Sequence, residues 1–273
     1  MDITNQAQAL QPYLVSLREA FHSCPETAGE ESKTAQRIVD ELEKIGGYTI
    51  TTQVGGHGVL AEIQGPNPGP TLVFRADMDA LNIQEETELS CASTNPGKMH
   101  ACGHDFHVTM LLGGAKLIKE QQAQLKGTIR LCFQPSEECT PKGGSRDMIE
   151  GGALKNADAV FGLHVWPDAP SGKFGIRPGP LMAASDRFFA RFKGRASHAA
   201  RPHEGVDALV AGAQFITTVQ TLISRNKNPL HDGVITMGKC VAGSAYNIVP
   251  EHCTIEGTCR TFLPEDRALI ETR

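Results

Sequence analysis

The stretch Thr71-Leu-Val-Phe-Arg-Ala-Asp-Met-Asp79 joins a short apolar run to two carboxylates. A Gly- and Pro-rich turn at 65–70 precedes it, so the run predicts a buried strand that starts after a turn. Two further apolar runs of this kind lie at 128–133 and 159–163. Helical patterns flank these strands at 5–45 and 108–122. Strands that alternate with helices predict an α/β fold with a largely parallel sheet covered on both faces.

The pattern changes after a Gly- and Pro-rich stretch at 172–182. Beyond it, the sequence predicts a strand, a helix, two strands and a helix, at 185–193, 206–225, 233–237, 254–262 and from 265 onward. That order is typical of a ferredoxin-like unit without its last strand. We therefore expect two domains, at 1–181 and 182–273.

Composition and charge exclude several classes of protein. The 273 residues are 40% hydrophobic and 21% charged, which is ordinary for a soluble globular protein. A net charge of −5 without a Lys/Arg-rich run argues against a nucleic-acid partner. No apolar run approaches the ~20 residues that cross a bilayer, and the N-terminus lacks the features of a signal peptide. The eight cysteines are irregularly spaced without Cys-x-x-Cys, which predicts reduced thiols in the cytoplasm.

Potential metal ligands follow the predicted strands of the first domain. Asp77 and Asp79 follow the strand at 71–75, the Glu137–Glu138 pair follows 128–133, and His164 follows 159–163. In open parallel sheets the ligand site lies outside the carboxyl ends of the strands. We therefore expect these side chains to converge at one edge of the sheet.

The stretch His100-Ala-Cys-Gly-His-Asp-Phe-His107 adds a thiol and imidazoles in the loop before the helix at 108–122. Cys102 and His104 are close enough in sequence to share one ion. A thiolate and a neutral imidazole suit zinc-like ions, and nearby carboxylates favour a second, harder ion. Two ions ~3.5–4 Å apart can share a hydroxide, and of two adjacent glutamates one can be a ligand and the other a general base.

Each of these groups has a simpler explanation when it is taken alone. Aspartates after a strand are often turn residues or helix caps, and Glu137–Glu138 could be a solvated surface pair. A lone His164 could be a hydrogen-bonded structural histidine, and Cys-x-His occurs by chance. The coincidence of all groups at predicted strand ends favours the metal site. Five histidines are interpreted as structural and two stay undecided: His22, His57, His100, His231 and His252, and then His107 and His203.

The motifs resemble those of a known family from about residue 15 to Arg273. They are Arg75-Ala-Asp-Met-Asp-Ala-Leu81, the stretch ending at His107, Gln134-Pro-Ser-Glu-Glu138, Ser197-His-Ala-Ala-Arg-Pro202 and Gly257-Thr-Cys-Arg-Thr-Phe262. The chain resembles the amidohydrolase branch of the aminoacylase/carboxypeptidase metallopeptidases, which includes hippurate hydrolases, N-acyl-amino-acid amidohydrolases and auxin-conjugate hydrolases. The resemblance implies a catalytic domain with a mixed, mostly parallel sheet (phosphorylase/hydrolase-like) and an inserted ferredoxin-like lid and dimerisation domain.

The resemblance also implies a role for each matching residue. Two divalent ions, Mn²⁺ or Zn²⁺, would be held by Cys102, His104, Glu138 and His164. Glu137 would be the general base. Asp77 would orient a metal-bound histidine, although Arg75 stands where other branches carry a histidine.

Three residues of the implied lid would act on the substrate. His198 would stabilise the oxyanion, often across a dimer interface. Asn247 and Arg260 would bind the carboxylate of the amino-acid half, for which a bidentate guanidinium is suited.

The predicted function is hydrolysis of N-acyl amino acids by a cytoplasmic homodimer with no nucleic-acid or membrane partner. A carboxypeptidase or dipeptidase acting through the same site is one alternative. The resemblance also implies that relatives continue beyond the equivalent of Arg273 and supply a last lid strand and a further metal-binding histidine. A truncated, catalytically incompetent product with a vestigial metal site is therefore the other alternative.

Overall fold

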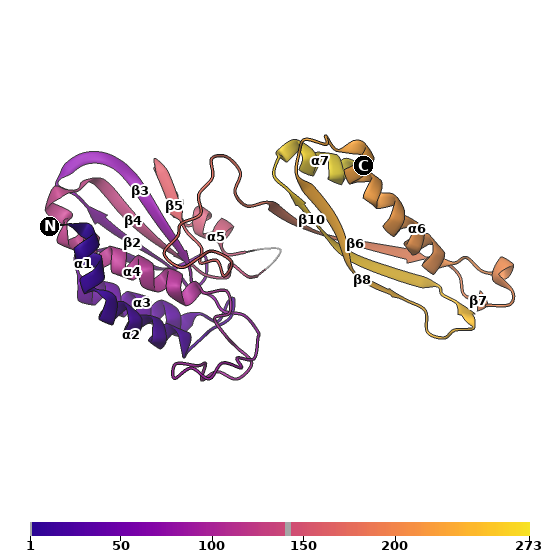
Figure 1. Cartoon of the computed structure of the whole chain (residues 1–273), viewed down its shortest axis with the longest axis horizontal. Coiled ribbons are helices and arrows are strands. Elements are labelled where there is room, and N and C mark those ends of the chain that lie inside the picture. The colour runs from indigo at the N-terminus through magenta and orange to yellow at the C-terminus, as the bar shows by residue number, and fades with distance from the viewer. Residues whose placement is uncertain (1, 140–142) are drawn as a thin grey trace. The chain divides into compact units, whose positions relative to one another are not determined.

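The computed structural model describes residues 2–139 and 143–273, and the chain divides into two compact units, Met1–Pro170 (unit 1) and Ser171–Arg273 (unit 2) (Figure 1). The division falls just before the Gly- and Pro-rich stretch at 172–182, near the end of which the sequence predicted the boundary, at 181. Within the described residues, no helix is both long enough and apolar enough to span a membrane.

Unit 1 is built on a five-stranded mixed sheet with the order β1-β2-β4-β3-β5. Its strands are β1 (Thr49–Val54), β2 (Gly58–Gln64), β3 (Asn67–Asp77), β4 (Lys126–Gln134) and β5 (Ala159–Gly162). The hairpin β1–β2 and the pair β2–β4 are antiparallel, whereas β4, β3 and β5 run parallel. The predicted α/β class and mixed sheet are confirmed.

Strand β3 begins earlier than the sequence predicted. Asn67 already pairs with Lys126, and the register shifts before pairing resumes at Thr71. Prolines are tolerated at the start of a strand and at bulges, because no ladder hydrogen bond from their nitrogen is needed there. The turn predicted over 65–70 is therefore wrong for 67–70, which is the beginning of β3.

The predicted helical region 5–45 consists of three helices, α1 (Ile3–Ala9), α2 (Gln11–His22) and α3 (Ser32–Ile45). Together with α4 (His104–Glu120), α2 and α3 cover one face of the sheet (Figure 1). Neighbouring residues of a strand point to opposite faces. Val59 and Ala61 accordingly pack in the core under these helices, while Leu60 packs with Met148 of α5 (Ser145–Glu150) on the other face.

Unit 2 contains a three-stranded antiparallel sheet with the order β6-β10-β8. Its regular elements are β6 (Ala184–Lys193), α6 (Ala208–Thr221), β8 (Gly233–Ala242), β10 (His252–Thr261) and α7 (Pro264–Thr272), with two short strands, β7 (Ser197–His198) and β9 (Ile248–Val249). Short helical turns occur in the chain at Gln122–Gln124, Pro202–Glu204 and Leu222–Asn226. The order of the five main elements is the predicted one, and the role of unit 2 as a lid stays a prediction.

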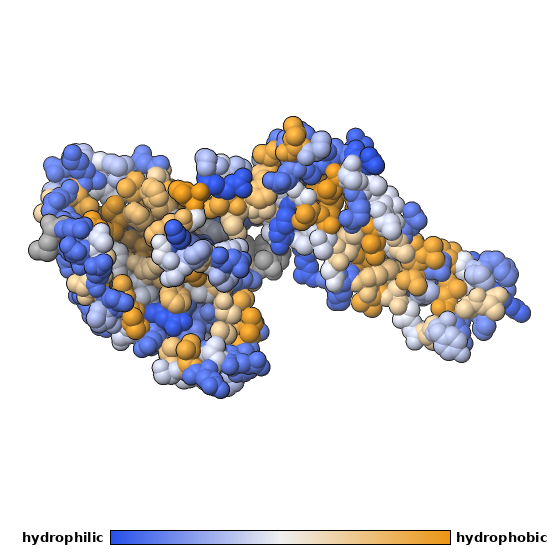
Figure 2. Space-filling view, viewed as in Figure 1, coloured by the Kyte–Doolittle hydropathy of each residue, from blue (hydrophilic) through white to orange (hydrophobic). Residues whose placement is uncertain are grey.

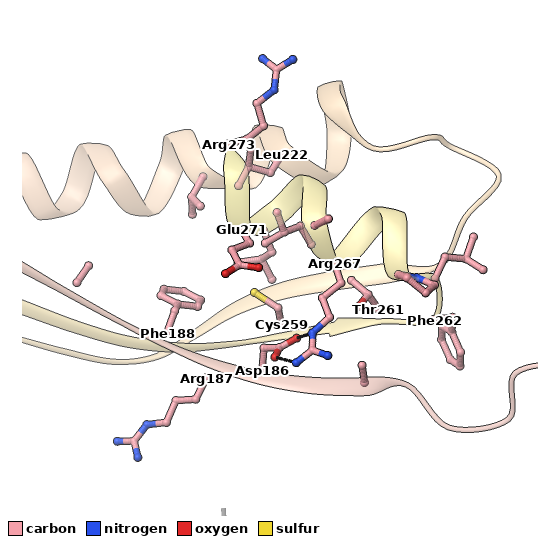
Figure 3. Close-up of a pocket in the computed structure, with 18 of the residues that line it drawn as sticks. Asp186, Arg187, Phe188, Leu222, Cys259, Thr261, Phe262, Arg267, Glu271 and Arg273 are labelled. Carbon is pink, nitrogen blue, oxygen red and sulfur yellow. Dashed lines mark hydrogen bonds and ion pairs between the residues drawn. The ribbon is translucent and has the colours of Figure 1, made fainter. Parts of the chain in front are cut away.

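Unit 2 has an open groove of about 880 Å³ between its sheet and its two helices (Figure 3). Side chains such as Phe188 of β6, Leu222 after α6 and Phe262 after β10 line it. An ion pair joins α7 to β6, with Arg267 Nη2 2.5 Å from Asp186 Oδ1. None of the predicted site residues lines this groove.

Apolar side chains also reach the surface around β5, the edge strand of the unit 1 sheet. Val160, Phe161, Leu163 and Trp166 are each about half exposed. Figure 2 shows hydrophobic atoms on the visible face of both units. The segment that carries His164 therefore lies at an apolar edge of the sheet.

Candidate metal centre

Three parallel strands of unit 1 end together at one edge of the sheet. Asp77, the last residue of β3, is in register with Gln134, the last residue of β4. Two positions earlier in β3, Arg75 is in register with Gly162, the last residue of β5. The residues that follow these ends therefore emerge at the same edge, as the sequence predicted.

His104 lies at the centre of the polar residues at this edge. Its Nε2 atom is 3.6 Å from Asp77 Oδ2, 4.0 Å from Glu137 Oε2 and 3.9 Å from Glu138 Oε1. Its Nδ1 atom is 3.4 Å from Asp79 Oδ1. His104 is the first residue of α4, so the prediction that it lies in the preceding loop is wrong, whereas Cys102 does lie there.

The surroundings of His104 fit a cation. The side chain is fully buried, and neither ring nitrogen has a hydrogen-bond partner among the described residues. Burial opposes a charge on the ring, but the Asp79 and Asp77 carboxylates outweigh it and raise the pKa of His104. A buried imidazole that makes no hydrogen bond and is surrounded by carboxylates is a chemically suitable ligand for a divalent ion.

Cys102 and His164 face each other next to His104. Cys102 Sγ lies 3.5 Å from His164 Nε2, and His164 Nδ1 donates a hydrogen bond to the Val165 carbonyl at 2.6 Å. This hydrogen bond places the proton on Nδ1 and leaves the Nε2 lone pair directed at the thiol, the arrangement that metal-binding histidines commonly have. Burial, with Glu138 adding to it, raises the pKa of the Cys102 thiol to about 12, so a metal ion would have to displace its proton.

The Glu137–Glu138 pair is held by two buried carboxylates from other parts of the chain. Ser136 has a left-handed backbone (φ 56°), and its amide donates to Glu31 Oε1 at 2.8 Å. The amide of Glu138 donates to Asp79 Oδ2 at 2.9 Å. Burial and the neighbouring Glu138 raise the pKa of Glu137. The two adjacent glutamates therefore have a fixed backbone at the edge of the site.

Asp77 lies between two basic side chains. Its Oδ1 atom is 2.5 Å from His107 Nδ1, and its Oδ2 atom is 2.6 Å from Arg75 Nη1. Arg75 Nε also donates to Gln134 Oε1 at 2.9 Å. Burial alone would raise the pKa of Asp77, but His107 and Arg75 outweigh it and lower the pKa to about 2. Asp77 is therefore ionised at neutral pH.

Three overlapping groups of residues bring potential ligand atoms within 4.8 Å of one another. Each group contains His104, which is joined by Cys102 and His164, by Asp77 and His107, or by Glu137 and Glu138. Six predicted site residues of unit 1 therefore lie together: Asp77, Cys102, His104, Glu137, Glu138 and His164.

The three predicted site residues of unit 2 do not all lie together. The amide of Ala199, next to His198, donates to the Asn247 carbonyl at 3.0 Å, at the end of unit 2 where β7 lies (Figure 1). Arg260 lies near the other end of β10, eight residues after His252. At ~3.3 Å per residue this is roughly 25 Å from the start of the strand. Within one chain, Asn247 and Arg260 cannot hold the same carboxylate.

Several residues that shape the site were not assigned a role from the sequence. Glu31 had no recognisable signal, and Gln134 belonged to a recognised motif without a role of its own, because the contacts of both join segments far apart in the chain. Asp79 stood out as a strand-end carboxylate, and His107 was left undecided. The structure shows that both contact this group of residues.

A substitution of Gly103, which lies between Cys102 and His104, tests how tightly this loop is packed. Its φ is +82°, and an added Cβ would lie 2.5 Å from Val165 Cγ2. We expect Gly103→Ala to lower the free energy of unfolding by at least roughly 1–3 kcal/mol, the cost of such a strained backbone, as measured by urea denaturation. Gly114→Ala, in open space within α4, is the matched control and should be neutral or stabilising by up to about 1 kcal/mol. Equal stability of the two variants would contradict this packing.

Comparisons with known proteins place the chain in one family. Residues 73–271 match the model of Peptidase family M20/M25/M40. The chain belongs to this family. Over 264 residues it is 45% identical to an N-acetyl-L-cysteine deacetylase of Bacillus subtilis, and the match covers 97% of this chain and 63% of that protein. Over 249 residues it is 43% identical to an N-acyl-L-amino acid amidohydrolase of Geobacillus stearothermophilus, and this match covers 91% of this chain and 67% of that protein.

A solved M20 structure is similar throughout the chain. The crystal structure of Bacillus subtilis YXEP, described as a dinuclear metal binding peptidase from the M20 family, aligns with a TM-score of 0.81 and 38% identity. The alignment covers 96% of this chain and 67% of that one. This M20 chain therefore spans about two thirds of the length of the relatives it matches.

Proposed function

We propose that this M20 protein is a metal-dependent amidohydrolase that cleaves N-acyl amino acids into a carboxylate and a free amino acid. The observation that carries the proposal is the position of Glu137, next to Glu138 and 4.0 Å from the His104 ring. One of the two carboxylates can bind metal while the other accepts a proton. The names of the similar deacetylase and amidohydrolase support this substrate class.

Four residues would hold two divalent ions, Mn²⁺ or Zn²⁺, in this proposal: Cys102, His104, Glu138 and His164. A thiol, two imidazoles and a carboxylate are donors that both metals accept. The ions, when bound, would polarise the amide carbonyl and lower the pKa of a water molecule. The dinuclear description of the similar YXEP structure supports the number of ions.

Glu137 would transfer the proton during hydrolysis. It would take a proton from the attacking water and deliver it to the leaving nitrogen. Burial and the Glu138 charge raise its pKa, which brings the carboxylate closer to the operating pH and makes it a stronger base than an ordinary glutamate. Asp77, held by Arg75 and His107, would stay ionised and orient its neighbours.

Residues of unit 2 would bind the substrate as a lid. We propose that His198 stabilises the oxyanion and that Asn247 and Arg260 bind the α-carboxylate. Because Asn247 and Arg260 lie at different ends of unit 2, these contacts require two copies of the chain. A homodimer through the lid domain would supply them. The eight free thiols are consistent with a cytoplasmic location.

The proposed function is tested by hydrolysis of a matched substrate panel. Acetyl- and benzoyl-amino acids, the corresponding dipeptides and the methyl esters are incubated with the protein, with and without Mn²⁺ or Zn²⁺. Metal-dependent hydrolysis of the acyl-amino acids is expected. Preference for dipeptides would instead indicate a dipeptidase, and bound metal without any hydrolysis would indicate a non-catalytic site.

Arg260→Ala should weaken hydrolysis of substrates that have a free α-carboxylate. Loss of a charge-assisted hydrogen bond costs about 1.5–3 kcal/mol, so kcat/KM should fall by roughly tenfold to a hundredfold or more. The matched control is Arg225→Ala, which removes an exposed arginine near the end of α6. For methyl-ester substrates, Arg260→Ala and the parent protein should have the same kcat/KM. An equal loss of kcat/KM on esters and free acids would show that Arg260 does not bind the carboxylate.

A further inference from the structure

We infer that His107 is a positioning residue that ties the Asp77 carboxylate to the segment carrying His164, and that it does not bind metal itself. His107 lies in α4 and is 3% exposed. It belongs to one of the three groups that could hold a metal ion. Proximity alone therefore does not decide whether His107 binds metal or positions other residues. Its hydrogen bonds decide between the two roles.

Both ring nitrogens of His107 are already engaged. The backbone amide of Val165 can only donate, and it lies 2.9 Å from His107 Nε2, so Nε2 accepts this hydrogen bond with its lone pair. Nδ1 then carries the ring proton and donates to Asp77 Oδ1 at 2.5 Å. A neutral imidazole has one donor and one acceptor, and neither is left for an ion. Coordination through Nε2 would leave the amide of Val165 without this acceptor.

The contact with Val165 fixes the position of the neighbouring His164. The amide of Val165 is held by His107, and its carbonyl accepts the Nδ1 proton of His164 at 2.6 Å. The Val165 side chain lies against Gly103, in the loop between Cys102 and His104. The rings of His107 and His164 also meet edge to face, with centroids 4.6 Å apart. His107 therefore acts on the Nε2 atom of His164 through the residue that follows it.

The first measurement concerns the metal-free protein and does not depend on the proposed function. ¹⁵N-labelled histidine spectra should show His107 protonated at Nδ1 and unprotonated at Nε2, with the signals assigned by their loss in His107→Gln. Addition of Mn²⁺ is unsuitable because it broadens signals, so Zn²⁺ is used. Zn²⁺ should shift Nε2 of His164 and leave His107 in the same tautomer. Protonation at Nε2, or a ligand-type shift of His107, would overturn the inference.

The second measurement compares two polar replacements of similar size. His107→Gln keeps an acceptor near the position of Nε2, whereas His107→Asn keeps a donor near Nδ1 and loses the contact with Val165. Zn²⁺ affinity from calorimetry should fall about 10–100-fold in His107→Asn and by a smaller factor in His107→Gln. In a His164→Ala background the two replacements should have equal affinities, because the effect of His107 passes through His164.

The possible outcomes distinguish failure of this inference from failure of the proposed function. The second measurement rests on the metal site of that proposed function. Equal affinities of His107→Gln and His107→Asn in the parent background would overturn the positioning role while the metal site stands. The same difference persisting in the His164→Ala background would also overturn it. Failure of the parent protein to bind Zn²⁺ would contradict the proposed metal site, and the tautomer in the metal-free protein would still decide the role of His107.

Discussion

Glu137→Gln should retain bound metal and lose most of its hydrolytic activity. The substitution preserves size and hydrogen bonding but removes the group that accepts the proton. General-base catalysis typically contributes about 10²–10⁴-fold, so kcat/KM for an N-acyl amino acid should fall by at least this order. Steady-state kinetics and metal analysis of the same preparation check both parts of the prediction.

Two controls make the Glu137→Gln result specific. Glu150→Gln changes an exposed glutamate at the end of α5 and should behave like the parent protein. Glu138→Gln should lower the metal content, because this carboxylate is the proposed ligand of the pair. Near-normal turnover of Glu137→Gln would exclude it as the base, and loss of metal in that variant would show that the roles of the two glutamates are reversed.

His104→Ala should abolish high-affinity metal binding. His104 is common to all three groups of potential ligands, and its ring lies within 4.0 Å of four carboxylates. Removing it takes away a ligand and leaves these carboxylates with less compensating charge. The loss should exceed the 10–100-fold that is typical when only an outer hydrogen-bond partner of a ligand is removed.

Calorimetric titration with Mn²⁺ and Zn²⁺ measures the effect of His104→Ala. His252→Ala is the control, because His252 is an exposed histidine on β10 in the other unit. A folded His104→Ala protein that binds both ions with the parent affinity would exclude His104 as a ligand.

The fold was predictable where a local pattern decides the structure. The apolar runs at 71–75 and 128–133 lie within β3 and β4, and the run at 159–163 contains β5. The carboxyl ends of parallel strands must share an edge. The break between α1 and α2 was not predicted, because only Leu10 separates the two helices. The first residues of β3 were missed because Pro and Gly indicate a turn unless a partner strand is known.

The candidate site was predictable for residues that directly follow strands or form a short motif. The residues that hold them in place could not be found in the same way. Glu31 reaches the amide of Ser136, and His107 reaches the amide of Val165, across 105 and 58 positions of the chain. Both accept from a backbone amide, a group that every residue except proline carries. The sequence alone therefore does not indicate which backbone amide donates to Glu31 or His107.

The parallel register of β3 between β4 and β5 has a consequence for how the protein folds. Glu138, which follows β4, and His164, which follows β5, reach the same edge only after both strands have aligned with β3. Closing such long loops is slow, and an ion that needs both strands in place has no preformed site in the unfolded chain. An ion at 100 times its dissociation constant would add about 2.7 kcal/mol to the native state alone. Such an ion would therefore act mainly on the lifetime of the folded protein and little on the speed at which it forms.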